Sequence, residues 1–155
     1  MEITMISNAS EVSIEIGKKM AELRNMNPPL KKSSILMRKS VKDNFSQGGR
    51  PIRWRPKSKA TIAIEKSILG RTTSKPLIFT GNLRKSISYR KVNDKIYEVF
   101  PAGIGYAGIH QYGGRTNFAG RNIPVPARPF MVFQNSDLDS IVNIFKEHIE
   151  KKLGI

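Results

Sequence analysis

Two histidines, His110 and His148, are the first side chains to consider for chemistry, because the chain has no cysteine. A histidine acts as a base or a metal ligand only when suitable partner groups lie close to it. No Asp, Glu or other His lies within ten residues of His110 on either side. Carboxylates are scarce more widely, since Glu65 is the only one between residues 44 and 93. We therefore expect no catalytic residue, no metal site and no enzymatic activity.

A glycine pattern at residues 103–108 matches the G-x-G-x-x-G signature of dinucleotide-binding proteins. That signature needs a long helix directly after it, and an acidic residue about 20 residues further on to hold the ribose. Here Gly113 follows too soon for a long helix, and the next acidic residue after Glu98 is Asp137. We expect these glycines to serve turns and the protein to bind no cofactor.

Basic residues dominate the charge of the chain, with 27 Lys and Arg against 12 Asp and Glu and a net charge of +15. Residues 18–75 alone carry +13. A surface of this kind attracts nucleic acid, acidic protein faces or anionic lipid. The candidate residues for contact with a polyanion are Lys39, Lys42, Arg50, Arg53, Trp54, Arg55, Lys57 and Lys59. Trp54 either stacks on bases or packs back onto the core, and both alternatives stay open at this point.

Three helices are predicted in the N-terminal half. The apolar spacing indicates a first helix that stops before Pro28, where the following prolines disfavour helical geometry. Pro29 is suited to open a second helix, which Gly48 would end. A third, short helix is expected over residues 58–69.

The pattern changes in the second half, where residues 87–92 and 96–100 are rich in β-branched and aromatic side chains and predict a hairpin with a tight turn. Residues 101–126 are expected to be mostly a Gly/Pro-rich loop. The last twenty residues predict an amphipathic helix, with a capping box formed by Ser136 and Asp139.

The fold class that follows is α+β: N-terminal helices, a small antiparallel sheet with a long Gly/Pro-rich loop, and a C-terminal amphipathic helix. One domain over residues 1–155 is expected from the length. No apolar run approaches the ~18 residues of a membrane-spanning helix, and no export leader is recognisable. We therefore expect no membrane association, and the absence of cysteine favours a reducing cytoplasm.

Four ordered motifs carry a resemblance to a known family. They are Phe45-Ser-Gln-Gly-Gly with Pro51-Ile-Arg-Trp-Arg-Pro56, then Thr61 with Leu77-Ile-Phe-Thr-Gly-Asn-Leu-Arg-Lys-Ser-Ile87, then Tyr106-Ala-Gly-Ile-His-Gln-Tyr-Gly-Gly114, then Ile123-Pro-Val-Pro-Ala-Arg-Pro-Phe130. In this order the motifs resemble the phage virion morphogenesis family, also described as tail-completion or head–tail joining proteins. The chain departs from the usual pattern at Lys57, where a leucine is common, and in lacking an Asp-Gly before Trp54.

The resemblance implies a structural protein of the virion, without enzymatic activity or cofactor, that is present in the host cytoplasm during assembly. It implies a homo-oligomeric ring that docks on other phage tail or neck proteins, with possible nonspecific contact to DNA. The residues expected to contact a subunit or partner are Tyr106, His110, Gln111, Tyr112, Arg128 and Phe130. The alternative function is a sequence-nonspecific nucleic-acid-binding module that uses the basic N-terminal half.

Overall fold

The computed structural model describes residues 9–118 and 120–155. Helix α1 (Ala9–Arg24) leads into α2 (Asn27–Gln47), with a break at the place where the two prolines were expected to stop the first helix. Gly48 ends α2 in the left-handed conformation, as predicted. Among the described residues, none of the helices combines the length and the apolar character needed to cross a bilayer.

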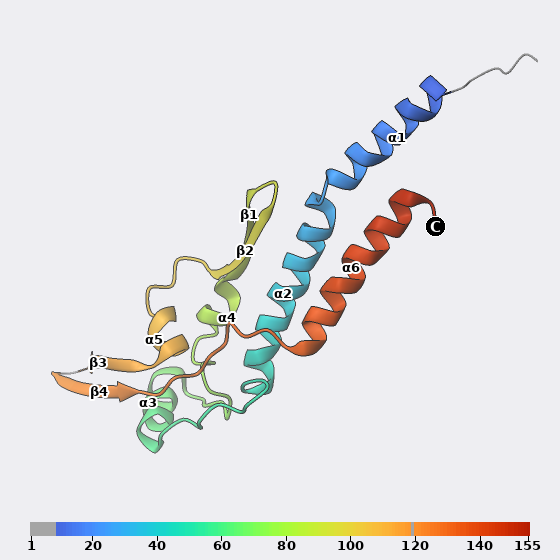
Figure 1. The fold of residues 1–155 in the computed structure, drawn as a ribbon. Coiled ribbons are helices and arrows are strands. Elements are labelled where there is room, and N and C mark those ends of the chain that lie inside the picture. The colour runs from blue at the N-terminus through green and yellow to red at the C-terminus, as the bar shows by residue number, and fades with distance from the viewer. Residues whose placement is uncertain (1–8, 119) are drawn as a thin grey trace, which may run out of the picture.

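Helix α2 is the centre of the molecule. On one side it contacts an antiparallel hairpin of β1 (Ile87–Asn93) and β2 (Ile96–Pro101), which the short helix α4 (Asn82–Ser86) precedes. On its other side α2 packs against the C-terminal helix α6 (Asn135–Leu153), which runs in the opposite direction (Figure 1). The predicted hairpin and the predicted helices are confirmed, and the α+β fold class with them.

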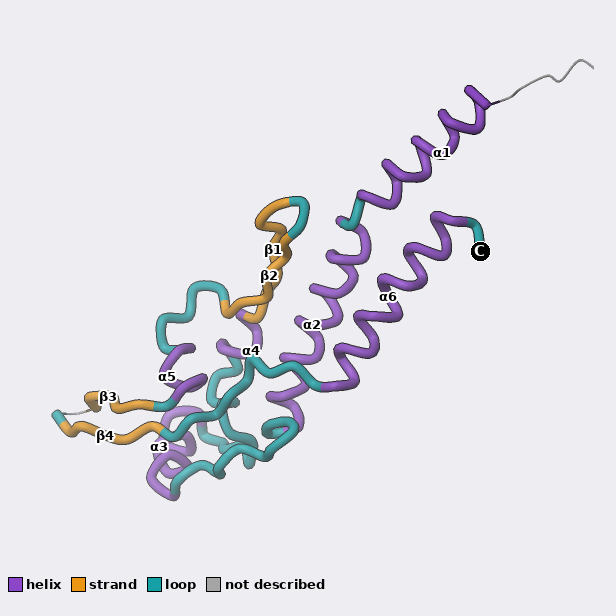
Figure 2. The backbone as a smooth tube through the Cα atoms, in the orientation of Figure 1, coloured by secondary structure: helices purple, strands orange, loops and turns teal. Residues whose placement is uncertain are grey.

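The prediction of a mostly irregular segment over residues 101–126 is wrong. This segment contains helix α5 (Ala107–Tyr112) and a second antiparallel hairpin, β3 (Gly114–Phe118) with β4 (Arg121–Val125). Figure 2 shows this hairpin as an arm that projects from the body. Its strands contain Thr116, Phe118, Ile123 and Val125, but Gly, Arg, Asn and a proline interrupt them, so they lack the continuous β-branched and aromatic pattern by which a buried strand is recognised.

A compact aromatic cluster holds the motif-bearing part of the chain together. The Phe45 ring packs edge-on against Trp54, with centroids 5.6 Å apart and planes at 79°, and against Phe130 at 5.3 Å. The indole nitrogen of Trp54 donates a hydrogen bond to the Pro129 carbonyl at 2.9 Å. The buried members of the cluster are Val41, Phe45, Trp54, Leu83, Ile87, Ala107 and Phe130.

A buried polar network joins α6 to α2. The Ser40 hydroxyl donates to the Asp137 carboxylate at 2.6 Å and accepts from Arg50 Nη2 at 2.8 Å. The same carboxylate accepts from the backbone N–H of Gln134 at 2.9 Å and so caps α6. The capping box predicted at Ser136 and Asp139 is therefore wrong by two residues, because the carboxylate that caps α6 also reaches across to α2.

Candidate partner-binding pocket

An open pocket of about 540 Å³ lies where several separate segments of the chain meet. Helix α3 (Lys59–Leu69), the turn before α4, the start of α5 and the segment after β4 each contribute to its wall. The residues that line it are Lys57, Thr61, Leu77, Phe79, Thr80, Gly81, Asn82, Leu83, Tyr106, His110 and Arg128. These segments belong to the second, third and fourth sequence motifs, so three of the four motifs converge here.

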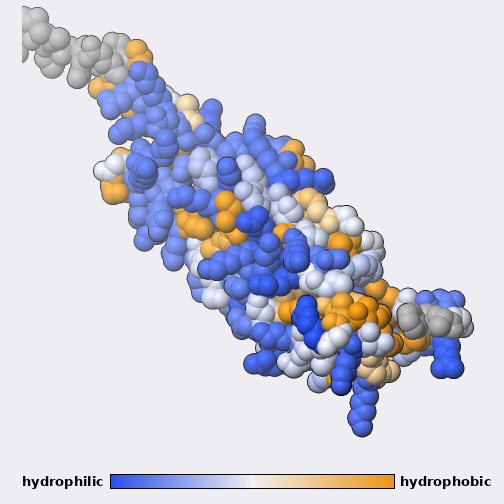
Figure 3. Space-filling model, turned by 180° about the vertical axis from the view of Figure 1, so that it is seen from behind, coloured by the Kyte–Doolittle hydropathy of each residue, from blue (hydrophilic) through white to orange (hydrophobic). Residues whose placement is uncertain are grey.

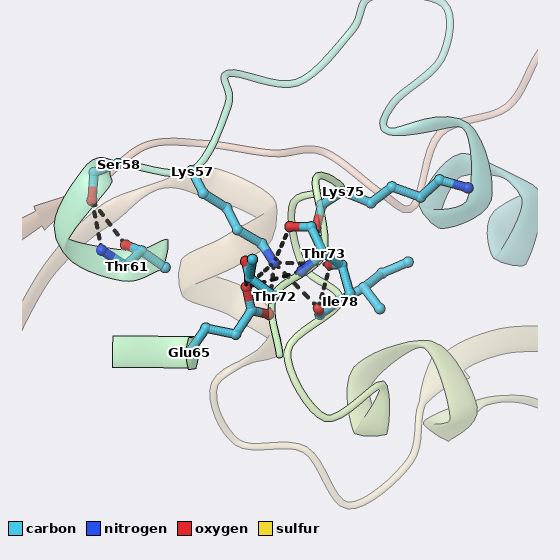
Figure 4. A network of polar contacts seen from close by, with 8 residues as sticks. All are labelled: Lys57, Ser58, Thr61, Glu65, Thr72, Thr73, Lys75 and Ile78. Atoms are coloured by element: carbon cyan, nitrogen blue, oxygen red, sulfur yellow. Dashed lines mark hydrogen bonds and ion pairs between the residues drawn. The ribbon is translucent and has the colours of Figure 1, made fainter. Parts of the chain in front are cut away.

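A buried ion pair fixes the wall formed by α3. Lys57 Nζ lies 2.7 Å from the Glu65 carboxylate, and the two side chains are only 6% and 0% exposed. The same ammonium donates to the carbonyl oxygens of Thr73 and Ile78, while the Thr72 hydroxyl donates to Glu65 (Figure 4). Burial raises the pKa of Glu65, but hydrogen bonds from Lys57, Thr72 and Thr73 lower it by more, so this pKa lies below its ordinary value.

The helix that carries Glu65 begins and ends as its sequence predicts. The Ser58 hydroxyl accepts a hydrogen bond from the Thr61 backbone N–H at 3.1 Å, which satisfies a donor at the start of α3. Gly70 ends the helix in the left-handed conformation. The two caps fix the start and the end of the helix that carries Thr61 and Glu65.

Leu77 adopts a positive φ of 60° on the floor of the pocket. A branched side chain in this region is uncommon and costs on the order of 1 kcal/mol or more, which the surrounding contacts must offset. Leu77 packs against the aromatic cluster on one side and faces the pocket on the other. Strain of this kind concentrates at binding sites, which makes the pocket floor a candidate contact surface.

His110 and Tyr106 form the rim of the pocket on α5. Their rings meet edge to face, with centroids 5.7 Å apart and planes at 84°. Burial, and to a smaller extent the charge of Arg128, lowers the pKa of His110, so its ring is neutral at neutral pH. His110 Nδ1 is buried and has no hydrogen-bond partner within the described part of the chain. An unpaired buried polar atom is costly, and a bound partner can satisfy it.

Arg128 brings a positive charge to the same rim. Its Nε donates to the carbonyl oxygen of Arg55 at 3.0 Å, and one Nη donates to that of Pro56 at 3.2 Å. These bonds tie the last motif to the first one. The pocket therefore presents an apolar floor beside a neutral imidazole and a guanidinium, a combination suited to an apolar side chain next to an acidic or carbonyl group.

The six expected partner-contact residues separate into groups. Tyr106, His110 and Arg128 line the pocket, and Tyr112 stands at the surface with 82% of its area exposed. Gln111 has a structural role, because its side-chain oxygen accepts hydrogen bonds from the backbone N–H groups of Phe130 and Met131 at 3.0 Å each. The expectation for Phe130 needs correction, since its side chain is 1% exposed and packs in the aromatic cluster.

The eight residues expected to contact a polyanion fall into an exposed group and a group directed into the protein. Lys39, Arg53, Arg55 and Lys59 are exposed, and Lys42 is half-buried. Trp54 lies in the core with 7% of its area exposed. Of the two alternatives for its side chain, packing onto the core is therefore correct and stacking on bases is not. Lys57 forms a buried ion pair with Glu65, and Arg50 donates hydrogen bonds to Ser40 and Asn44, so both side chains are directed into the protein.

The glycine pattern at residues 103–108 leads into α5, which is six residues long and ends at Gly113. Gly113 has a φ of +76°, and a Cβ there would meet the Ala127 backbone nitrogen at 2.9 Å. Glycine is thus required at that position by the close approach of two chain segments. Within the ranges that the structure describes, no group of three His, Asp or Glu residues is arranged to hold a metal ion.

Sequence reasoning missed two kinds of site residue. The residues of the pocket floor and the turn before α4 were recognised as a motif and were not assigned to contacts. Glu65 was noted only as a scarce carboxylate, although a single acid among the twelve bases of residues 44–93 is itself a signal for a structural ion pair. Seen from behind, apolar side chains gather at the end of the molecule that carries the β3–β4 arm (Figure 3).

Comparison with known proteins identifies the family of the chain. Residues 8–150 match the phage virion morphogenesis family. The chain is 28% identical over 145 residues to the Mu-like prophage FluMu G protein 2 of Haemophilus influenzae, with 94% of each chain covered. No solved structure matches the chain. Because the match spans nearly its whole length, the chain belongs to the phage virion morphogenesis family.

Proposed function

We propose that the protein is an oligomeric subunit at the end of the tail or at the head–tail junction, and that the pocket between α3, α4 and α5 receives other phage tail or neck proteins. Its place is the virion, after assembly in the host cytoplasm. Membership of the family gives the chain a structural role in phage assembly and associates it with other phage proteins. The finer assignment is our inference from the pocket.

The observation that carries the proposal is the convergence of the motifs. Thr61, the turn around Gly81, and Arg128 are far apart along the chain, yet they line one open pocket. A purely structural motif residue would be expected in the core, as Phe45 and Trp54 are. Exposed polar and aromatic groups that gather in a concave site are typical of a binding surface.

The β3–β4 arm supports contacts of the same kind. A two-stranded hairpin that stands alone is marginally stable in water. This arm projects from the body, and its residues are largely exposed. We infer that the arm and Tyr112 at its base are covered by a neighbouring subunit or a tail protein in the virion.

The test is genetic complementation of a phage or prophage that lacks this gene. Tyr106→Ser and Arg128→Ala should each reduce the yield of infectious particles, because both remove groups from the pocket rim. Arg71→Ala is the matched control, since Arg71 is exposed and lies outside the pocket. Electron microscopy of the particles should show tails that are incomplete or not joined to heads. Variants that fold and complete tails as the wild type does would contradict the proposal.

Contact with nucleic acid remains a second candidate, now restricted to phosphates. Arg53, Arg55 and Lys59 are exposed on one short segment, and guanidinium and ammonium groups pair with phosphates irrespective of sequence. Because Trp54 is buried, base stacking at this segment is no longer part of the hypothesis.

A further inference from the structure

The C-terminal helix α6 leaves part of its apolar stripe exposed. Near its start α6 is attached to α2 by the hydrogen bond between Ser40 and Asp137, and Ile141, Ile144 and Phe145 are half-buried further along the helix. Leu138, Val142 and Leu153 are exposed on a different side. Between them the surface is hollowed by about 510 Å³, and this hollow is lined by Ile141, Val142, Phe145, Lys146, Ile149 and Glu150. An apolar stripe of this length on a helix indicates a protein interface.

The charge around this stripe differs from that of the rest of the molecule. Helix α1, which reaches α6 through the Glu22–Lys152 ion pair, carries three acidic and three basic residues. Helix α6 carries four acidic and three basic residues. Together the two helices have a net charge of −1 in a chain of +15. A nucleic acid or an acidic protein is drawn to the other, basic surfaces, whereas a second copy of this cationic chain is repelled least here.

The charges beside the stripe also have a self-complementary order. Asp139 and Lys146 are seven residues apart, which is about two turns, so they lie on the same side of α6. Both are exposed. If two α6 helices run antiparallel with their midpoint between Val142 and Asn143, Lys146 of each lies opposite Asp139 of the other. The pair forms twice, as the twofold symmetry of an isologous contact requires.

We propose that two copies of the chain associate through antiparallel packing of their α6 stripes, with Val142 at the centre and the Asp139–Lys146 pairs at the flanks. The inference deepens the proposed function and rests on it in one respect, since it names a self-contact of the proposed oligomer. A twofold contact joins subunits in pairs and leaves the pocket and the arm available for other partners.

The experiment is sedimentation of the purified full-length chain over a concentration series at about 0.15 M salt, where the Debye length is about 8 Å and repulsion between the cationic bodies is reduced. The wild type should reach twice the mass that Val142→Asp reaches. The variant should weaken association at least about tenfold, because it places a charge in an apolar seam. Val92→Asp is the matched control, because Val92 is 52% exposed, comparable to 64% for Val142, and lies on β1.

Charge reversal tests the antiparallel register. Lys146→Glu should weaken association about fivefold through loss of two flanking pairs. Adding Asp139→Lys to it should restore the wild-type dissociation constant. Thermal melting of each variant separates loss of association from loss of folding.

A wild type that stays monomeric, an equal effect of Val92→Asp, or a double variant no better than Lys146→Glu would overturn the inference. None of these readouts involves the pocket. Normal tail completion by Tyr106→Ser and Arg128→Ala would contradict the proposed function while leaving the mass measurement intact.

Discussion

Within the basic segment of residues 50–59, two interleaved sets of side chains have opposite roles. Arg50, Trp54 and Lys57 turn inward, where they bond to Ser40, Pro129 and Glu65. Arg53, Arg55 and Lys59 are exposed to solvent. In sequence the two sets look like one cationic cluster with an aromatic residue in the middle.

The number of charged residues in a segment of sequence therefore overestimates the charge that the segment presents at the protein surface. Lys57 is paired, so it contributes nothing to a field outside the protein. Arg50 is partly buried and donates hydrogen bonds to Asn44 and Ser40 of α2. The inward set determines stability, and the outward set is available for a partner.

Lys57→Met should have the largest effect on stability. It leaves the Glu65 carboxylate buried without its counter-charge, which typically costs about 3–5 kcal/mol. Lys59→Met makes the same chemical change two residues later at an exposed position and should alter stability by less than about 0.5 kcal/mol. Urea unfolding followed by circular dichroism measures both, and equal midpoints would contradict the division.

Trp54→Phe should have the next largest effect. It leaves the Pro129 carbonyl without its donor, which costs about 1–3 kcal/mol for a buried acceptor, and it leaves space beside Phe45. Tyr112→Phe removes a polar group from an exposed aromatic residue and should leave the unfolding midpoint unchanged. If both substitutions were neutral, Trp54 would not be a structural residue.

Acid should weaken the inward set through Glu65. Because the folded-state pKa of Glu65 lies below its ordinary value of 4.5, the ionised side chain stabilises the fold above that pH, and this contribution is lost as the pH falls through the folded-state pKa. The free energy of unfolding of the wild type should therefore fall more steeply below about pH 4.5 than that of Glu65→Gln. Parallel pH profiles would show that Glu65 is not the group responsible.

The outward set should affect binding and leave stability unchanged. Replacing Arg53 and Arg55 together by Ala should change stability by less than about 0.5 kcal/mol. If the segment contacts phosphates, the slope of log affinity against log salt should fall in magnitude by about two. Fluorescence anisotropy with two unrelated duplexes measures this slope and should give equal affinities for both.

Arg50→Ala is the control from the inward set, and it should lower the melting temperature without changing the salt slope. A salt-resistant preference for one duplex would indicate base reading instead. Absence of binding at low salt would assign the outward set to an acidic protein partner.

Much of the fold could be predicted because its signals are local. Gly48 ends α2, and Ser58 and Gly70 bracket α3, each through backbone geometry that the residue type itself favours. Helix α2 begins at Asn27, two residues before the predicted start at Pro29, and both prolines lie in its first turn. The β1–β2 hairpin was recognisable because one side of it packs on α2 and needs apolar residues. The β3–β4 hairpin packs on little else, so polar residues and a proline interrupt the few apolar residues of its strands.

The sequence by itself determined the ends of α1 and α2, both ends of α3, the first hairpin, the excess of positive charge and the family to which the chain belongs. Only the tertiary structure decided which charged and aromatic side chains are buried. Trp54 bonds to a carbonyl 75 residues away, and Arg128 bonds to carbonyls more than 70 residues away. Such contacts leave no periodic pattern along the chain, because burial depends on which distant segments meet, whereas helix caps and turns depend on neighbours within a few residues.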